Sequence, residues 1–287
     1  GLIARIETFT QDSGLPLSLK NFIGYYHLDP RSIYGKFSFS RLCADAGVCD
    51  DFAEPAESIL TKAFSKLVAV DSRRWIKFLT DILPRFSCEL AASLPDFEKR
   101  MLQMFYITVF QEAADWRSHT AQANMQLLAD SPIMMHELYA LLALNLERID
   151  FIDQPVPLGF DCPLDLHCTY TRDQILIAMD YMTPKNVREG VKWLPDKQVD
   201  VFFITLNKAD KDYSPTTMYN DYSINESLFH WQSQSTTSDT ASTGQRYINH
   251  RQRGSRVVLF VREFKQDSIG AAPYTCLGTA AYVKHTG

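Results

Sequence analysis

A proline-rich stretch at residues 153–163 divides the chain into two halves with different residue patterns. Three prolines and a glycine fall within it, and such a density interrupts helices and strands. With 287 residues the chain is long enough for two domains. We therefore expect a helical domain over 1–152, a connector over 153–169 and a mainly β domain over 170–287.

The first half has the apolar spacing of a helical bundle. One core-facing stripe consists of Leu138, Leu141, Leu142, Leu146 and Ile149, interrupted by Asn145. Prolines that suit first helical positions follow Asp29, Glu54 and Ser131. We predict seven or eight helices, of which those at 17–27, 30–34 and 38–46 form a compact cluster similar to a helix-turn-helix unit.

The second half has the pattern of β structure. Residues 199–206 and 256–262 are apolar runs of strand length, and 277–283 is a third, in which Gly278 allows a bulge. A short strand at 247–249 is expected to form a hairpin with 256–262, turned at 253–255.

One helix is predicted ahead of these strands by the capping box at 171–174. The polar run 233–243 is expected to be a mobile loop. The fold class is therefore α+β: an N-terminal helical bundle followed by a curved or barrel-like, mainly β domain with one or two flanking helices.

Charge and cysteine content narrow the class of protein. A formal net charge of −5 gives no overall attraction to nucleic acid, so such binding requires a local basic patch. The six cysteines form no C-x-x-C pair. A zinc site on Cys43/Cys49 or Cys162/Cys168, near His167, is one interpretation, and reduced thiols of a cytosolic protein are the one we favour. We predict no metal and no cofactor.

Nothing in the sequence predicts membrane insertion or export. It has no run of 18 or more apolar residues and no signal-peptide pattern at its start. We expect a cytoplasmic protein without a membrane partner. Both ends are expected to be cut from a longer polypeptide.

Several blocks of residues resemble one protein family. In the second half they are TRDQI at 171–175, VREGV at 187–191, SPTTMY at 214–219, DY at 221–222, LFHWQSQ at 228–234 and TGQRYINH at 243–250. They resemble a domain of unknown function at the C-terminus of bacterial superfamily II DEAD/DEAH-type helicases, which often also carry a phospholipase D-type nuclease domain. The first half is similar to the helical region that precedes this domain, through residues 16–25, 29–34 and 41–47.

The resemblance implies an accessory region of an ATP-dependent DNA helicase in a restriction or anti-phage system. The helicase core of the same polypeptide would be one partner, and a nuclease domain or subunit another. The chain itself lacks the G-x-x-x-x-G-K-[ST] phosphate loop, since Gly35-Lys36 is followed by Phe37 and has no upstream glycine. We therefore expect no ATPase and no other enzyme activity in this region.

The strongest local feature is a basic segment. Between residues 244 and 265 the sequence has six basic residues and one acidic residue, Glu263. Tyr247, His250 and Phe264 alternate with them, so the segment suits contact with a phosphate backbone and with bases. The alternative is a solvated hairpin whose arginines pair with acids elsewhere.

The segment before the polar loop has two interpretations. His230 and Trp231 suit stacking on an unpaired base, with Gln232 and Gln234 reading its edge. Strand alternation instead buries Phe229 with Trp231 and leaves the other three outside, and this is the interpretation we favour for the indole. The hydroxyl-rich segment 213–222 suits either ligand contact or a plain turn.

We predict that the β domain binds DNA and recognises a sequence, a structure or a modified base. The predicted contacts are Arg188, Lys192, His230, Gln232, Gln234, Gln245, Arg246, His250, Arg251 and Arg253. The alternative is a protein-interaction module that docks a nuclease or assembles the complex. A third hypothesis is a cryptic metal-dependent nuclease, in which Glu263 and Lys265 form an E-x-K pair with Asp200 or Asp221 as a second acid.

Overall fold

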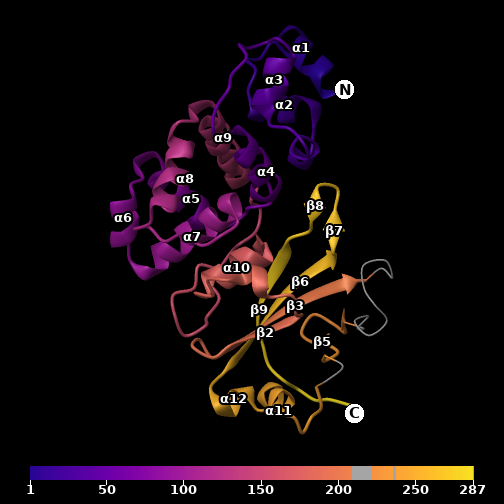
Figure 1. Cartoon of the computed structure of the whole chain (residues 1–287). Helices are drawn as coiled ribbons and strands as arrows, with labels where there is room; N and C mark the ends of the chain where they lie inside the picture. Colours follow the sequence, from indigo (N-terminus) through magenta and orange to yellow (C-terminus); the bar gives the residue numbers. More distant parts are fainter. Residues whose placement is uncertain (209–220, 235–236, 287) are drawn as a thin grey trace. The chain divides into compact units, whose positions relative to one another are not determined.

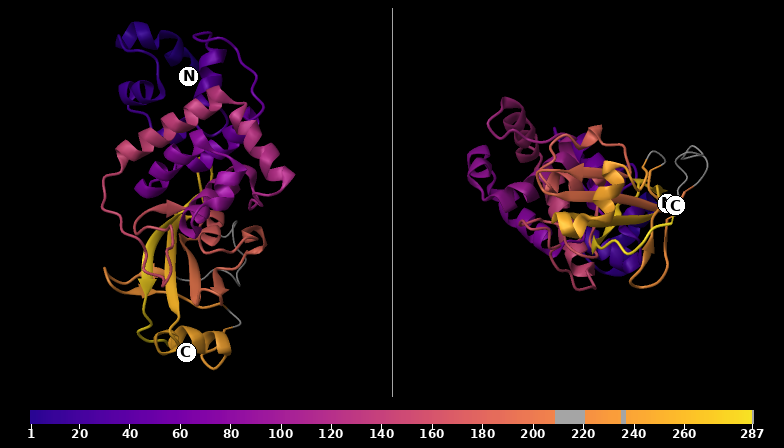
Figure 2. Two further views of the ribbon diagram at one scale, coloured as in Figure 1. Left: turned by 90° about the vertical axis from the view of Figure 1, so that its left-hand side faces the viewer. Right: turned by 90° about the horizontal axis from the view of Figure 1, so that it is seen from below.

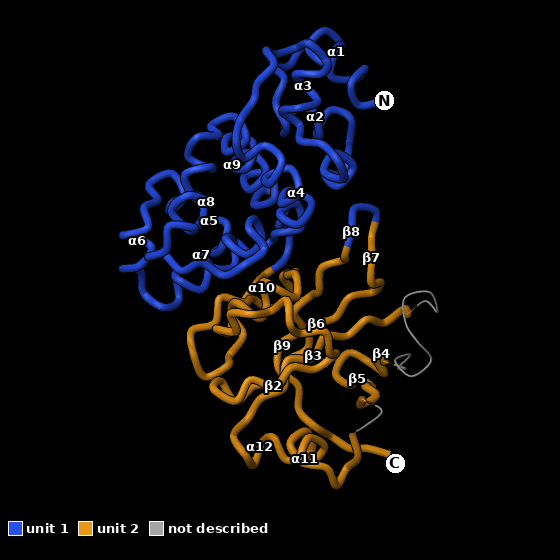
Figure 3. The backbone as a smooth tube through the Cα atoms, viewed as in Figure 1, with its two compact units in different colours: residues 1–151, 268–270 blue, residues 152–267, 271–287 orange. Residues whose placement is uncertain are grey.

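The computed structural model describes residues 1–208, 221–234 and 237–286 (Figure 1). It has two compact units (Figure 3): unit 1 comprises residues 1–151 and 268–270, and unit 2 comprises residues 152–267 and 271–287. Helices dominate the N-terminal part and strands the C-terminal part. The predicted mixed class, helices first and strands after, is confirmed.

Unit 1 is built from α-helices, nine of them among the residues described. They are α1 (Leu2–Ser13), α2 (Leu19–Tyr26), α3 (Phe39–Asp45), α4 (Glu57–Leu67), α5 (Arg73–Ile82), α6 (Cys88–Ser93), α7 (Asp96–Phe110), α8 (His119–Ala129) and α9 (Pro132–Arg148). Two 3-10 turns, η1 (Pro30–Ser32) and η2 (Leu83–Arg85), accompany them. The prediction of seven or eight helices was therefore too low.

Serine side chains begin many of these helices. The side chains that accept a hydrogen bond from the backbone N–H three residues on are those of Ser18, Ser38, Ser72, Ser87 and Ser118. Asp29 caps η1 by accepting a hydrogen bond from the N–H of Arg31, two residues on, and Pro30 stands at the first position as predicted.

Glu54 and Ser131 each serve the helix that follows the other. A helix was predicted to begin at Pro55, after Glu54. This prediction is wrong, because α4 starts only at Glu57. The carboxylate of Glu54 instead accepts hydrogen bonds from the N–H groups of Ile133 and Met134 at the start of α9, at 2.9 and 2.8 Å. The Ser131 hydroxyl in turn accepts one from the N–H of Ala56, at 2.8 Å. Two helix starts are thereby held to each other.

The predicted apolar stripe is confirmed for its first three leucines on α9, whereas Leu146 is half-buried and Ile149 lies just after the last helical residue, Arg148. Leu138, Leu141 and Leu142 are completely buried, and Asn145, which interrupts the stripe, donates its side-chain N–H to the carbonyl of Leu67 at 3.0 Å. Glu137 on the same helix is also buried, and its carboxylate accepts hydrogen bonds from two backbone N–H groups at the start of α3.

Unit 2 is organised around a five-stranded sheet with the order β1-β9-β6-β3-β2. Its strands are β1 (Thr169–Tyr170), β2 (Val191–Leu194), β3 (Val199–Asn207), β6 (Arg256–Phe264) and β9 (Tyr274–Ala280). Two short pairs are β4 (Tyr222–Ser223) with β5 (Phe229–His230), and β7 (Gln266–Asp267) with β8 (Gly270–Ala271). The helical elements are α10 (Arg172–Ala178), η3 (Pro184–Asn186), α11 (Ser242–Ile248) and α12 (His250–Arg253).

The five-stranded sheet is open, with β1 and β2 at its edges. The barrel-like alternative is therefore wrong, since no closed barrel occurs in the described part of the chain. Strand β3 pairs with β6 in parallel, and the other neighbours in this sheet are antiparallel. Within the described ranges, three short α-helices accompany the sheet, where one or two were expected. The capping box at Thr171 and Gln174 begins α10 as predicted.

The predicted hairpin between 247–249 and 256–262 is wrong. Residues 247–249 lie in α11 and at its C-terminal end, and α12 follows directly. Gly254, expected in a hairpin turn, instead ends α12 in the left-handed conformation, with φ of 71°. The bulge expected at Gly278 is confirmed by a register shift between β6 and β9 and by a φ of 86°.

Side chains alternate between the two faces of this sheet. On one face Phe202, Ile204, Val257 and Val261 form a buried cluster, against which Trp231 and Tyr247 pack among others. Phe203 and Phe260 lie on the opposite face. The guanidinium of Arg172, in the first turn of α10, lies 4.3 Å from the centre of the Phe203 ring on that face.

Among the described residues, no single helix is both long enough and apolar enough to cross a membrane. Helices α8 and α9 meet the length and composition only as a pair, and they are bent by 84° at the break between them.

Candidate nucleic-acid interface

Helix α11 is fixed to the sheet by an ion pair between Arg246 and Asp200. The Nε and Nη2 atoms of Arg246 donate to the two carboxylate oxygens of Asp200, each at 2.8 Å. Asp200 is fully buried on β3. The guanidinium lies 4.3 Å from the ring centre of Trp193 on β2. Arg246, predicted to contact DNA, therefore points into the domain and anchors α11.

Burial governs the ionisation of this cluster. Desolvation raises the pKa of Asp200 above its usual value, although Arg246 opposes the shift. Desolvation likewise raises the pKa of Tyr247, the next residue on α11, to about 12. The phenol is neutral at physiological pH, and the cluster is a dry, charge-compensated support for the helix.

His250 is the second inward-facing anchor. It is buried at the start of α12. Its Nε2 accepts the backbone N–H of Tyr282 at 3.0 Å, and its Nδ1 lies 3.4 Å from the carbonyl oxygen of Ser255. The first contact requires an unprotonated Nε2, so the proton of a neutral ring sits on Nδ1. His250 thus links α12 to the C-terminal residues, and its ring does not face solvent.

Other residues of the TGQRYINH block position the same two helices. A Cβ atom on Gly244 would lie 2.0 Å from the carbonyl oxygen of Ser238, so the chain approaches too closely for any side chain. Gln245 donates to the carbonyl of Asp239 at 2.7 Å and accepts from the amide of Asn249 at 2.9 Å. Gln245, another predicted DNA contact, is therefore half-buried and engaged within the domain.

Arg251 and Arg253 are the predicted contacts that α12 leaves exposed. No ion pair joins either guanidinium to an acid in the described part of the chain. Helices α11 and α12 lie at one end of the sheet, next to the C-terminal residues (Figure 2). The anchors described above hold the backbone that carries both arginines, with Gln252 exposed between them. This basic turn is the core of the candidate interface.

The segment from β5 to Gln234 lies against α11. Trp231 packs on Phe202 and Tyr247, with ring centres 4.3 and 5.4 Å apart. Phe229 and Trp231 both pack against the core cluster as strand alternation predicted, but each is only half-buried. His230 is half-buried and stacks on Tyr222 at 4.7 Å. Gln232 is exposed beside them, and Gln234 is half-buried.

The remaining two predicted contacts lie before and within β2. Arg188 is exposed in the loop before β2. Lys192 is half-buried on the sheet face opposite to Trp193, with its ammonium 4.8 Å from the ring centre of Tyr181. Arg172 donates to the carbonyl oxygen of Glu189 at 2.7 Å and so joins the TRDQI and VREGV blocks. Among the described residues, no direct contact ties Arg188 or Lys192 to the basic turn.

The hydroxyl-rich segment 213–222 lies mostly outside the described residues, because only positions 221 and 222 are described. Asp221 is buried and accepts hydrogen bonds from the backbone N–H of Gln232 at 2.9 Å and from the ammonium of Lys208 at 3.2 Å.

The nuclease hypothesis gains no support from these positions. Asp200 is paired with Arg246, and Asp221 with Lys208. Asp200 also lies opposite Val257, six residues before Glu263 on β6, which corresponds to about 20 Å along a strand. Glu263 contacts the side-chain amide of Asn207 at 3.4 Å.

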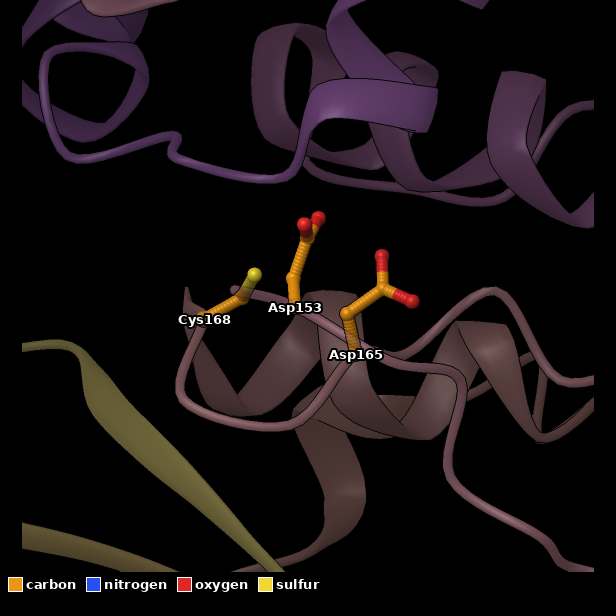
Figure 4. Close-up of side chains that lie close together, drawn as sticks. All are labelled: Asp153, Asp165 and Cys168. Atoms are coloured by element: carbon orange, nitrogen blue, oxygen red, sulfur yellow. The ribbon is translucent and has the colours of Figure 1, made fainter. Parts of the chain in front are cut away.

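Among the described residues, three potential metal ligands come together elsewhere in unit 2. One ligand atom each of Asp153, Asp165 and Cys168 lies within 4.8 Å of the others (Figure 4). Asp165 and Cys168 are buried, and Asp153 is half-buried. All three also take part in other interactions of the protein, so we assign no metal to them. The other pair of the zinc interpretation consists of Cys43, which is buried, and Cys49, which is exposed, and both are free thiols.

Residues 164–287 match a domain of unknown function, DUF3427. The match covers all nine strands in the described part of the chain, together with α10, α11 and α12. No curated protein and no solved structure matches the chain. Residues 164–287 are therefore similar to a domain family that is defined by its sequence and has no known function. The function of this region is inferred below from the candidate nucleic-acid interface.

Asp200 is the important residue whose role is hard to infer from the sequence. From the sequence, Asp200 was considered only as a second acid beside Glu263 in a nuclease site. In the structure its carboxylate instead binds Arg246 and so holds α11 on the sheet. The available signal is a single carboxylate inside the apolar run 199–206, since a buried acid requires a basic partner. The identity of that partner, 46 positions away, has no local signal.

Proposed function

We propose that unit 2 is a DNA-recognition module which binds the phosphate backbone through the exposed face of α12. The observation that carries the proposal is the pair of exposed arginines, Arg251 and Arg253, on a backbone held by Arg246 and His250. Guanidinium groups of this kind bind phosphate oxygens at two points and with geometric specificity. Gln232 and His230, on the neighbouring segment, are the side chains proposed to contact bases.

The biological setting is part of the same proposal. The resemblance to helicase C-terminal regions supports a role as an accessory, non-catalytic part of an ATP-dependent helicase in restriction or phage defence. Unit 1 would then couple this module to the motor. The net charge of the chain is −5, so it has no overall attraction to DNA and needs this local basic patch to bind it. Loss of the two arginines should therefore have a clear effect on DNA binding.

Fluorescence anisotropy of the whole chain tests the proposal. The probes are labelled single-stranded, duplex and forked DNA, without metal and at two salt concentrations. We expect salt-sensitive binding to at least one probe. Replacing both Arg251 and Arg253 by Ala should weaken binding. It should also lower the slope of log affinity against log salt by about two, because each arginine neutralises about one phosphate.

A matched control removes the same charge elsewhere. Lys77 and Arg117 are exposed in unit 1, and the double variant Lys77→Ala, Arg117→Ala should retain the slope of the wild type. An equal loss in both double variants would show an effect of net charge alone. Absence of binding to all three probes at low salt would eliminate DNA recognition by this chain.

A further inference from the structure

Exposed apolar side chains gather at the far end of the sheet from α12. A groove of about 510 Å³ lies there, lined by Leu206, Phe229 and Val261 from the core face and by Phe264 and Leu277 at its margin. Phe264 is 53% exposed and Leu277 45% exposed. Large apolar side chains left in water around a hollow are typical of a binding surface.

The neighbouring hairpin contributes two residues to the lining of the groove. Ser223 and Phe229, on the paired strands β4 and β5, both line the groove. The same hairpin exposes Tyr222, Ile224 and Leu228 to solvent. Tyr222 points to the opposite face of the hairpin from Ser223 and Phe229, because successive side chains of a strand alternate. We call the groove and the residues that line it the apolar groove surface.

The bulge in β9 creates one wall of the groove. The register between β6 and β9 shifts between Leu259 and Phe260, and Leu277 lies in the bulge with Gly278. A Cβ atom at Gly278 would come within 2.5 Å of Leu166, so the bulge is packed from behind. The bulge, packed against Leu166, thus fixes the position of Leu277 at the margin of the groove.

Among the described residues, the exposed charges beside the groove are acidic. Glu263 lines the groove and is exposed, and Glu226 is exposed on the hairpin. The half-buried Lys265 and Asp267 offset each other in charge. Nucleic acid is therefore a poor occupant, since its phosphates would meet uncompensated carboxylates.

The basic residue of the lining, Arg262, is engaged elsewhere. It donates to Thr205 Oγ1 at 2.9 Å and to the carbonyl of Ala272 at 3.2 Å, and its guanidinium lies 4.3 Å from the ring centre of Tyr274. Within the described part of the lining, the exposed charge that the groove presents to a partner is consequently that of Glu263.

We propose that the apolar groove surface binds a segment of a protein partner in which a large apolar side chain stands next to Lys or Arg. The apolar side chain fills the groove and its basic neighbour pairs with Glu263. Strand β6 separates the groove from α12 by about 25 Å, so a protein partner and DNA can occupy unit 2 together. The groove is thus distant from the proposed phosphate contacts, Arg251 and Arg253, whereas the proposed base contact His230 lies next to Phe229 on β5.

Three fluorescein-labelled decapeptides test this assignment by anisotropy with the whole chain. The first has two leucines flanked by lysines, the second has the lysines replaced by glutamates, and the third has the leucines replaced by serines. We expect the first to bind most tightly and the other two to bind about tenfold more weakly or worse. Equal affinities for the three, or no binding of the first, would overturn the proposal.

Variants of exposed residues locate the binding without disturbing the core. Leu277→Ser should weaken binding of the lysine–leucine peptide about tenfold, and Glu263→Lys should reverse the preference between the lysine and glutamate peptides. Val283→Ser, at an exposed apolar residue outside the groove, should change nothing. An unaltered affinity in Leu277→Ser, or an unaltered preference in Glu263→Lys, would refute the site.

Two further measurements separate the other possible occupants. A dimer in sedimentation experiments that Leu277→Arg dissociates would show that a second copy fills the groove, contrary to the proposal. Leu277→Ser should leave salt-dependent DNA binding unchanged, so failure here and failure of the proposed DNA recognition are told apart.

Discussion

Arg246 and Asp200 form a two-point ion pair although 46 positions separate them in the sequence. The pair joins α11 to the start of β3, and the aromatic ring of Trp193 covers the guanidinium. The arginines of the basic segment 244–265 therefore have two different roles. Arg246 supports the structure, whereas Arg251 and Arg253 remain at the surface.

Removal of Arg246 should cost far more stability than removal of Arg251. Arg246→Ala leaves the carboxylate of Asp200 buried and unpaired, and such a loss destabilises by about 3–5 kcal/mol. Arg251→Ala removes an exposed side chain and should change the free energy of unfolding by less than about 0.5 kcal/mol. Hydrogen exchange in residues 242–254 should become faster for Arg246→Ala alone. Similar exchange rates in both variants would contradict the anchoring role.

Asp200 should also leave a signature in the pH dependence of stability. Its pKa is raised in the folded state by burial, so the folded protein holds this proton more tightly than the unfolded chain does. Its contribution to stability must then fall as the pH rises from about 4, the unfolded value, through the raised folded value. The free energy of unfolding of the wild type minus that of Asp200→Asn should decrease over this range. A difference that grows with pH would contradict the raised pKa.

Two glycines should respond to alanine in opposite directions. At Gly244 a methyl group would meet the carbonyl oxygen of Ser238 at 2.0 Å, so the start of α11 must shift, and we expect a loss of at least about 2 kcal/mol. Gly24 lies within α2, is exposed and has no atom within 4 Å of the added carbon. Gly24→Ala should therefore stabilise by about 0.5–1 kcal/mol. Thermal unfolding of both variants checks the signs.

Glu137 and Glu147 offer a matched test on one helix. Glu137→Ala removes the acceptor of the N–H groups of Phe39 and Ser40, and we expect a loss of about 3 kcal/mol. Glu147 forms an exposed ion pair with Lys20, and its replacement by Ala should cost less than about 1 kcal/mol. Hydrogen exchange at residues 39–45 should increase only for Glu137→Ala. An equal increase in both would argue against the buried cap.

Local signals in the sequence were sufficient for most elements of the fold. The apolar run at 199–206 and the capping box at Thr171 predicted a strand and a helix that the structure contains. The error at 247–255 has a physical cause, because a glycine in the left-handed conformation ends a helix as readily as it turns a hairpin. Gly254 does the first, while the sequence around it suggested the second.

The candidate site was less accessible to prediction, because its geometry depends on distant partners. Arg251 and Arg246 have the same charge and lie five positions apart, and only the position of Asp200 distinguishes their roles. Glu54 and Ser131 show the same limit in unit 1. Pro132 begins α9 after Ser131 as predicted, but the side chains of Glu54 and Ser131 each accept hydrogen bonds from a helix start about 75–80 positions away.

The parallel pairing of β3 with β6 has a consequence for the order of folding. Thr205 and Arg262 are register partners 57 positions apart, so the chain must close a long loop before this ladder can form. The β2–β3 hairpin closes over a few residues and should form earlier. The basic turn and the β4–β5 hairpin both lie within that loop, so neither should acquire its final support until the slow closure is complete. In a nascent or refolding chain, ligand binding should therefore appear late, together with the pairing of β3 and β6 and after most of the local structure.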